Sequence, residues 1–507
     1  MGANIQPNNY LGPLQRIRFW YAILLVITAV FVVRLFYLQV IKHDYYNTSA
    51  LKGQLKEYEI PAKRGVIEAH SGNDIVPIVL NETKYTLFAD PKFITNPGDS
   101  AGKIQQIIGG NSQDYENKMK VPNSRYAILA KKLDKSQSDR IMALGIKGIG
   151  TREAVYRTYP QGSLGSQVLG FVNDDGQGKY GLEQALDQDL QGKPGLLKAI
   201  TDARGVPLAS QKDNVLIEPI DGKRVVLTVD LGMQQQLEEI LKQGLDRARS
   251  KSGSALIMNV KTGEIKAMAN YPTYNPAEYN KVEDASLFTN PAVSSPLEVG
   301  SIMKPLTAAA ALDKGVVNRN TSYYDPSYFI VDDAKITNIE EDGGAGTKTV
   351  QDIIQLSLNT GATWLLMQMG GGKINEQARV TWHDYMTNHY GFGKLTGIEQ
   401  GYESEGSIPD PKNGFGLDIQ YANSAFGQGM TATPLQMAAA MGSVINGGTY
   451  YRPRLIDKII GDNDKTIDQK KPEVVRTNVV NQQTSKDIRE IMEYAFSKNY
   501  LIYGLKD

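Results

Sequence analysis

Residues 298–305 of this chain read Glu-Val-Gly-Ser-Ile-Met-Lys-Pro and continue into four alanines at 308–311. On a helix, the spacing of Ser301 and Lys304 places both side chains on one face, one turn apart. A serine hydroxyl becomes a nucleophile when a neighbour takes its proton, and a lysine in a partly desolvated cleft can have its pKa lowered enough to do so. The stretch therefore predicts a nucleophile and its base at the start of a buried helix, whose dipole stabilises developing negative charge.

The spacing of Ser301 and Lys304 does not single out this pair by itself. The same Ser-x-x-Lys pattern occurs at Ser49 with Lys52 and at Ser100 with Lys103. Taken alone, each pair is more often a helix cap or a surface serine than a catalytic site. Only Ser301 lies between a glycine, which lets a ligand approach the backbone, and an apolar helix.

Ser357 and Asn359 form a second candidate group. The serine offers a hydroxyl for proton relay, and the asparagine offers an amide that can hold a peptide group of a substrate. The same spacing recurs at 71–73 and at 497–499. We favour Ser357 because it lies at a break between two helix-like runs, 351–356 and 363–369.

The composition excludes several classes of function. The 507 residues exceed one ordinary core, so we expect two or three folded parts. Lysine plus arginine and aspartate plus glutamate each number 55, and this balance gives no field that favours nucleic acid. The absence of cysteine excludes disulfides and thiolate metal sites. The four histidines form no His-Glu-x-x-His pattern, so zinc hydrolysis has little support. A histidine-based serine triad is not excluded by this count.

One segment of the sequence can cross a membrane. Phe19 to Leu38 carries a single charge, Arg34, which can extend toward the headgroups, and its length of about 20 residues spans a bilayer. Arg16 and Arg18 precede it without an acid, so the positive-inside tendency places the N-terminus in the cytoplasm and the chain after Val40 outside. A cleaved signal peptide is the alternative, but small residues do not follow the apolar run.

After this anchor the sequence predicts an α+β fold in two parts. Residues 41–220 mix short strand-like and helix-like runs and form an extended α+β module. From Asp221, a strand at 224–230, a helix at 233–245 and a hairpin at 254–269 open a domain with a largely antiparallel sheet. Further helices are expected at 305–314, 351–356, 363–369 and 434–445. The predicted domains are a tail at 1–18, a transmembrane anchor at 19–40, an intermediate module at 41–220 and a final domain at 221–507.

A series of short segments, in order along nearly the whole chain, resembles the class B penicillin-binding proteins. The motifs of that family include Ser-x-x-Lys and Ser-x-Asn. The resembling segments are Lys63 to Ile67, Arg157 to Pro160, Val168 to Val172, Gly181 to Glu183, Thr262 to Ile265, Tyr274 to Pro276, Glu298 to Pro305, Phe426 to Gly429, Thr433 to Gln436 and Asn446 to Gly448. Two departures are Ala69-His70, where the family has Asp-Arg, and Val299, where it has proline.

The resemblance implies a pedestal domain of the penicillin-binding protein dimerisation type at 41–220 and a transpeptidase domain, similar to serine β-lactamases, at 221–507. Its implied activity is cross-linking of peptidoglycan stem peptides by a D,D-transpeptidase. Ser301 would be the nucleophile, Lys304 its base, Ser357 a proton relay and Asn359 a substrate-binding residue. No cofactor or metal is needed for acyl transfer. β-Lactams would acylate Ser301, and a membrane glycosyltransferase with division or elongation proteins would be partners, the division type being favoured.

The family's third motif, Lys-Thr-Gly on a strand of the cleft, is expected after Ser-x-Asn. The only Lys-Thr-Gly here is at 261–263, before Ser301 and at a hairpin turn, where we expect a structural role. The resemblance implies that this strand also supplies one N–H of the oxyanion hole, and losing one such donor costs about 10² to 10³ in rate. The sequence stops at Asp507 without the strand, so we expect a truncated fragment. A catalytically impaired scaffold or β-lactam sensor is the alternative, and a β-lactamase is the rival enzyme.

Overall fold

A computed structural model describes residues 13–46, 55–200, 215–339, 344–414, 416–461 and 464–503. The fold is α+β, as predicted. Contacts divide the chain into two compact units, Met1–Ala62 with Lys193–Ile220 and Lys63–Gly192 with Asp221–Asp507. The Ser49 and Lys52 pair lies outside the described residues.

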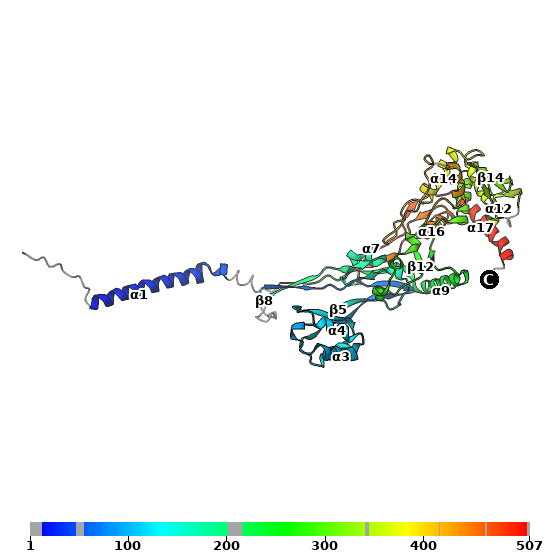
Figure 1. Ribbon diagram of the computed structural model, residues 1–507. Helices are drawn as coiled ribbons and strands as arrows, with labels where there is room; N and C mark the ends of the chain where they lie inside the picture. Colours follow the sequence, from blue (N-terminus) through cyan, green and yellow to red (C-terminus); the bar gives the residue numbers. More distant parts are fainter. Residues whose placement is uncertain are drawn as a thin grey trace, which may run out of the picture. The chain divides into compact units, whose positions relative to one another are not determined.

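The first unit contains the predicted anchor. Helix α1 (Pro13–Phe36), dark blue in Figure 1, continues into a π-helical turn, η1 (Tyr37–Ile41). Within the described part of the chain, Ile17–Ile41 is the one helix long and apolar enough to cross a membrane, with a mean hydropathy of 2.4. The same unit holds a three-stranded antiparallel sheet of β1 (Leu55–Ile60), β8 (Gly195–Ile200) and β9 (Val215–Ile217).

The second unit is built on a sheet that joins both predicted parts of the chain. Its strands run in the order β19-β18-β10-β2-β3-β4, with β5 paired to β3. Strand β10 runs parallel to β2, with Val225 opposite Ile67, and the other pairs are antiparallel. The domain boundary near 220 stays a prediction. The bounds are β2 Ile67–Ser71, β3 Asp74–Ala89, β4 Ala127–Leu133, β5 Ile149–Thr158, β10 Arg224–Asp230, β18 Ile456–Ile460 and β19 Thr466–Gln469.

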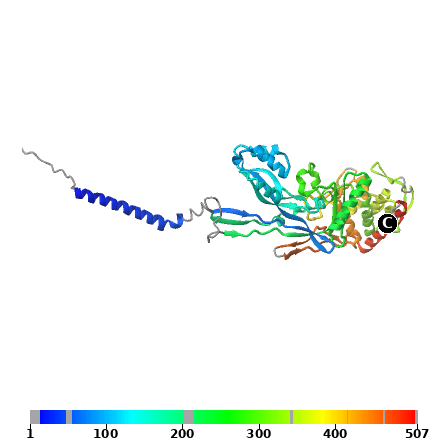
Figure 2. The same cartoon turned by 90° about the horizontal axis from the view of Figure 1, so that it is seen from below.

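Three helices pack beside the far part of β3. Helices α3 (Pro97–Ile108) and α4 (Ser112–Met119), light blue in Figure 2, lie side by side, and α5 (Lys135–Met142) contacts α3. Leu87, Ile104 and Ile141 are buried between these elements. Ser100 is buried in α3 while Lys103 pairs with Asp99, so this Ser-x-x-Lys pattern forms no serine and lysine site. Here the pattern serves packing and a surface ion pair.

Three of the resembling segments meet in one buried ion cluster. The carboxylate of Glu183 has no exposed surface and accepts hydrogen bonds from Arg64 Nε and Arg157 Nε, both at 2.7 Å. Arg157 Nη1 also donates to Asn81 Oδ1 at 2.9 Å. Removing one partner of such a cluster leaves an uncompensated buried charge, which typically costs about 3–5 kcal/mol. These contacts therefore join the segment before β2, strands β3 and β5, and helix α7 (Gly181–Ala185).

The opening of the predicted final domain has the expected elements. Strand β10 is followed by α9 (Leu231–Ala248), whose first turn is capped by Asp230 through Met233 N. Strands β11 (Gly253–Met258) and β12 (Ile265–Tyr271) pair as the predicted antiparallel hairpin. The Lys-Thr-Gly sequence forms its turn, as expected. At Gly263, φ is 74°, and an added Cβ would lie 2.2 Å from a backbone oxygen.

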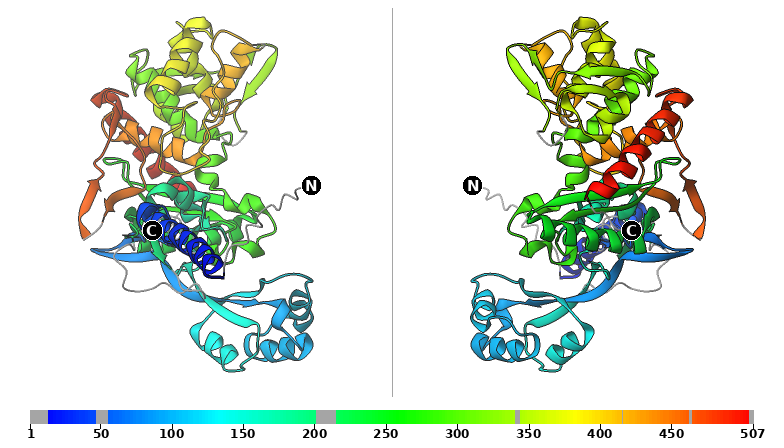
Figure 3. Two further views of the ribbon diagram at one scale, coloured as in Figure 1. Left: turned by 90° about the vertical axis from the view of Figure 1, so that its left-hand side faces the viewer. Right: turned by 90° about the vertical axis from the view of Figure 1, so that its right-hand side faces the viewer.

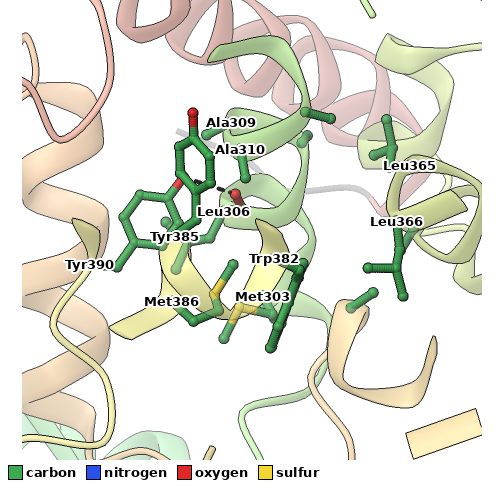
Figure 4. Close-up of a cluster of buried hydrophobic side chains, with 14 of the residues drawn as sticks. Met303, Leu306, Ala309, Ala310, Leu365, Leu366, Trp382, Tyr385, Met386 and Tyr390 are labelled. Carbon is green, nitrogen blue, oxygen red and sulfur yellow. Dashed lines mark hydrogen bonds between the residues drawn. The ribbon is translucent and has the colours of Figure 1, made fainter. Parts of the chain in front are cut away.

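The helical part surrounds one central helix, α11 (Lys304–Asp313), which is buried from Lys304 to Leu312. Figure 4 shows Met303 and Leu306 packed among aromatic and aliphatic side chains, with Tyr390 donating to the carbonyl of Leu306 at 3.1 Å. Red α17 lies beside orange α16 in Figure 3. The surrounding helices are α12 Val350–Gln355, α13 Asn359–Met369, α14 Glu376–Asp384, α15 Leu417–Ala425, α16 Pro434–Ile445 and α17 Gln482–Tyr503.

Candidate active site

Ser301 and Lys304 are in contact, as their spacing predicted. Ser301 lies in a 3₁₀ turn, η5 (Gly300–Met303), and Lys304 is the first residue of α11. The lysine side chain is 2% exposed, while the serine is exposed. Lys304 Nζ donates to Ser301 Oγ at 3.0 Å. The 3₁₀ turn differs from the expected α-helix, but with three residues per turn it still places residues three apart above one another.

Ser357 completes a group of three polar side chains. It lies between α12 and α13, at the predicted helix break, with φ of 55°. Lys304 Nζ donates to Ser357 Oγ at 2.8 Å and also to its carbonyl oxygen. The left-handed backbone of a serine costs on the order of 1–2 kcal/mol. This backbone conformation directs both oxygens of Ser357 toward the lysine. The Lys304 amine therefore bridges the exposed hydroxyl of Ser301 and the half-buried hydroxyl of Ser357.

Asn359 begins α13, two residues after Ser357. Its Nδ2 donates to the carbonyl of Thr337 at 3.0 Å, at the end of strand β15 (Ala334–Thr337). The amide is thus held on the side of the site formed by the β14–β15 hairpin, where β14 spans Tyr328–Val331. Its role in holding a peptide stays a prediction.

A glycine-rich segment braces the turn that carries Ser301. Gly300 N donates to the carbonyl of Gly427 at 2.9 Å, and Gly429 N donates to Glu298 Oε1 at 2.7 Å. At Gly427, φ is 91°, and an added Cβ would lie 2.0 Å from the carbonyl oxygen of Gly300. This segment was singled out in the sequence only through its resemblance. Two glycines separated by one residue were the available local signal of a close backbone approach.

A buried carboxylate supports the other side of the site. Asp325 has no exposed surface and accepts hydrogen bonds from Thr360 Oγ1 at 2.6 Å, from Tyr323 Oη at 3.1 Å and from the N–H of Ser327 at 2.8 Å. Thr360 N donates to Asn338 Oδ1 at 3.1 Å. The N-cap residue of α13 provides no side-chain hydrogen bond to the first turn. The distant Asn338 and Asp325 instead accept hydrogen bonds from Thr360 in that turn. Burial, followed by Asp325, raises the pKa of the Tyr323 hydroxyl, which keeps it a donor. This network was not predicted from the sequence.

The competing Ser-x-Asn patterns have other structural settings. Ser71 ends strand β2, and the following residues form its turn to β3. Ser497 lies within α17 and donates to the carbonyl of Tyr494 at 2.8 Å. Neither serine lies at a break between two helices, whereas Ser357 does, and its role as a proton relay stays a prediction.

Comparison with known proteins identifies the family. The penicillin-binding protein transpeptidase domain matches residues 253–503, and the penicillin-binding protein dimerisation domain matches residues 59–227. Stage V sporulation protein D of Bacillus subtilis is 31% identical over 467 residues, covering 91% of this chain and 69% of that protein. The chain belongs to the class B penicillin-binding proteins. For such a protein, helix α1 and η1 form a membrane anchor.

Other similar proteins align with most of this chain. Peptidoglycan D,D-transpeptidase FtsI of Escherichia coli is 27% identical over 445 residues, covering 84% of this penicillin-binding protein and 70% of the relative. Penicillin-binding protein PbpB of Mycolicibacterium smegmatis is 28% identical over 78% of the chain, which spans 60% of that relative's length. Penicillin Binding Protein 2X of Streptococcus thermophilus has the same fold, with a TM-score of 0.65 at 24% identity over 86% of this chain and 66% of that one.

Proposed function

We propose that this penicillin-binding protein is a serine-type peptidoglycan D,D-transpeptidase that works through an acyl-enzyme on Ser301. The observation that supports it most is the position of the buried Lys304 amine, 3.0 Å from Ser301 Oγ and 2.8 Å from Ser357 Oγ. The amine of the base thus lies within hydrogen-bond distance of both the nucleophile and the relay, which is the geometry that general-base activation of a hydroxyl requires.

In the first half-reaction, Ser301 Oγ attacks the carbonyl carbon of the penultimate D-alanine of a D-Ala-D-Ala stem peptide. Lys304 Nζ, in its neutral form, accepts the hydroxyl proton. The tetrahedral intermediate collapses with cleavage of the C–N bond, and the proton passes to the leaving D-alanine amine. An ester between Ser301 and the stem peptide remains.

In the second half-reaction, an amine of a neighbouring stem peptide attacks the ester carbonyl. Its proton is taken up by the Lys304 and Ser357 pair, and Ser301 leaves as the hydroxyl when the proton returns to its oxygen. Ser357 supports this transfer because its hydroxyl lies against the same amine as Ser301. Asn359 holds the donor peptide through its side-chain amide, exchanging the Thr337 contact for the substrate.

The setting of the reaction follows from the anchor. The positive-inside tendency of Arg16 and Arg18 supports a cytoplasmic N-terminus, with the two folded parts outside the bacterial cell membrane. We propose the division-type role, in keeping with relatives named FtsI, with a membrane glycosyltransferase and division proteins as partners. Residues 41–220 act as the pedestal and 221–507 as the catalytic domain. β-Lactams acylate Ser301 in place of the stem peptide.

Labelling with a fluorescent penicillin tests the proposal. We expect Ser301→Ala to abolish the label and Ser49→Ala, the same change in another Ser-x-x-Lys pattern, to leave it intact. The experiment uses this chain. Label that survives Ser301→Ala means that the nucleophile assignment is wrong. Rapid release of hydrolysed penicillin, without cross-linked product from stem peptides, would instead favour a β-lactamase.

A further inference from the structure

A hollow of about 270 Å³ lies in the second unit, away from the residues of the Ser301 site. It is bordered by strands β4 and β5, by residues 172–176 and by the 3₁₀ turn η3 (Pro276–Lys281). We call it the basic hollow, because four cationic side chains line it, Lys131, Lys132, Arg152 and Arg157. One acid, Asp174, is part of the same lining.

A β-bulge brings two adjacent lysines to this hollow. Tyr85 of β3 pairs with Leu133 of β4, and Leu87 pairs with Ala130, so Lys131 and Lys132 together stand opposite a single residue. Neighbouring residues of a regular strand point to opposite faces, and a bulge redirects one of them. Lys132 has φ of 63°, a left-handed conformation that costs a lysine on the order of 1 kcal/mol. This strained bulge is what lets both lysines line one cavity.

Two of the four cations have no carboxylate partner among the described residues. Lys131 pairs with Asp174 at 2.7 Å, and Arg157 pairs with Glu183. Lys132 Nζ donates only to a neutral group, the carbonyl of Ala277, at 2.8 Å, and lies 5.9 Å from the centre of the Tyr156 ring. Within the described ranges, Arg152 makes no ion pair. The rim of the basic hollow therefore has two positive charges in excess.

The buried side of the hollow adds donors that lack acceptors. Arg157 is 4% exposed, and its Nη2 has no hydrogen-bond partner within the described structure. The buried hydroxyl of Tyr159 has none there either, and burial raises the pKa of Tyr159 so that it stays protonated. Buried donors without acceptors are rare and often mark an ion or water that belongs to the site. Both residues line the same hollow as the unpaired cations.

We propose that the basic hollow binds an anionic ligand through a carboxylate or phosphate group. Oxyanions offer acceptors to several cationic donors at once, and hydrogen bonds between charged partners are about twice as strong as neutral ones. Tyr156, Tyr279 and Pro276 supply apolar surface for the uncharged remainder of the ligand. This second site shares no residue with the Ser301 site, so it stands independently of the proposed transpeptidase chemistry.

Isothermal titration calorimetry on the purified full chain tests the site, with sodium phosphate and sodium acetate as probes at constant ionic strength. The test variant is Lys132→Gln with Arg152→Gln. The matched control is Arg140→Gln with Lys147→Gln, which removes two exposed pedestal cations outside the hollow. We expect saturable binding to the unaltered protein, weakened about tenfold or more in the test variant because charge-assisted contacts are lost, and unchanged in the control.

The two probes distinguish the ligand classes. Saturation by phosphate alone assigns a phosphate group as the ligand. Saturation by acetate shows that the hollow accepts a carboxylate. An equal loss of affinity in the test and control variants would mean an adventitious ion only and would overturn the site. Absence of saturable heat with both probes would overturn it as well. Fluorescent penicillin labelling of the test variant, expected at the unaltered level, verifies that the chain is folded.

Discussion

Thr360 Oγ1 lies 2.6 Å from Oδ2 of Asp325, a carboxylate with no exposed surface. Changing Asp325 to alanine would leave the donors of Thr360, Tyr323 and Ser327 without their acceptor. We expect this to destabilise the protein by about 2–4 kcal/mol and to slow penicillin acylation about tenfold, because α13 carries Asn359 at its start and Ser357 just before it.

Denaturant midpoints and the acylation rate constant, measured well below the unfolding transition, check both effects of Asp325→Ala. Asp175→Ala, at an exposed carboxylate outside this network, is the control. An unchanged acylation rate would limit Asp325 to a role in stability.

Gly427→Ala should weaken penicillin labelling through a steric contact with the turn that carries Ser301. Gly427 and Gly447 both have left-handed backbones, with φ of 91° and 102°, so alanine strains either position by about 1 kcal/mol. Only at Gly427 would the new methyl group meet the Gly300 carbonyl, whereas the space around Gly447 is open. We therefore expect at least a tenfold loss of penicillin labelling for Gly427→Ala and near-normal labelling for Gly447→Ala. Equal labelling of both variants would show that the contact does not hold the Ser301 turn.

Lys304→Met tests the base. Methionine keeps much of the buried volume but cannot accept the proton of Ser301, so we expect acylation to slow by about 10² to 10⁴. Lys314→Met, at an exposed lysine beyond the other end of α11, should acylate normally. Stopped-flow acylation with a chromogenic β-lactam gives the rate constants. A Lys304→Met protein that acylates at the normal rate would remove Lys304 from the mechanism.

Glu399 predicts a pH dependence of stability. Burial raises its pKa above the ordinary 4.5, although the N–H of Leu455, 2.8 Å from Oε2, partly opposes this. A carboxyl with a raised folded pKa stabilises the protein below its unfolded pKa, and this contribution is lost as the pH rises through the folded pKa. Glutamine stays neutral and keeps an acceptor for Leu455. Glu399→Gln should therefore raise the urea midpoint at neutral pH.

The effect of Glu399→Gln should disappear as the pH is lowered below about 4, where the glutamate is protonated in both states. Exposed Glu405→Gln serves as the control at each pH and should leave the midpoint unchanged throughout. The compared quantity is the urea midpoint of Glu399→Gln minus that of the unaltered protein. A difference that is lower at neutral pH than at acid pH would contradict the expected direction of the effect.

Sequence patterns predicted the helices and contacts that depend on residues close together in the chain. Helix α16 matches its predicted range, Pro434–Ile445, because Thr433 and Gln436 form a capping box and Pro434 suits the first turn. The contact between Ser301 and Lys304 needed only their spacing, and the helix break predicted the setting of Ser357. The choice among equivalent motifs came from their local context and from the resemblance, since spacing alone left three serines open.

What the sequence did not predict depends on long-range contacts. Asp325 reaches Thr360 across 35 positions, and no periodic pattern links them. The parallel pairing of Val225 with Ile67 joins β10 to β2, a strand near the other end of the intervening sequence, and no local pattern records it. The left-handed backbone of Lys132 arises because β4 holds one residue more than β3 between two pairs, which composition does not record.

The sheet that runs through both parts of the second unit has a practical consequence for dissecting the protein. Strand β10 opens the predicted catalytic domain, yet one of its two edges is covered by β2. A fragment expressed from Asp221 onward would expose that edge as a row of unpaired N–H and C=O groups, with buried Val225 and Leu227 beside it. Such a fragment is a template for aggregation, so the smallest soluble catalytic piece should retain residues 63–192.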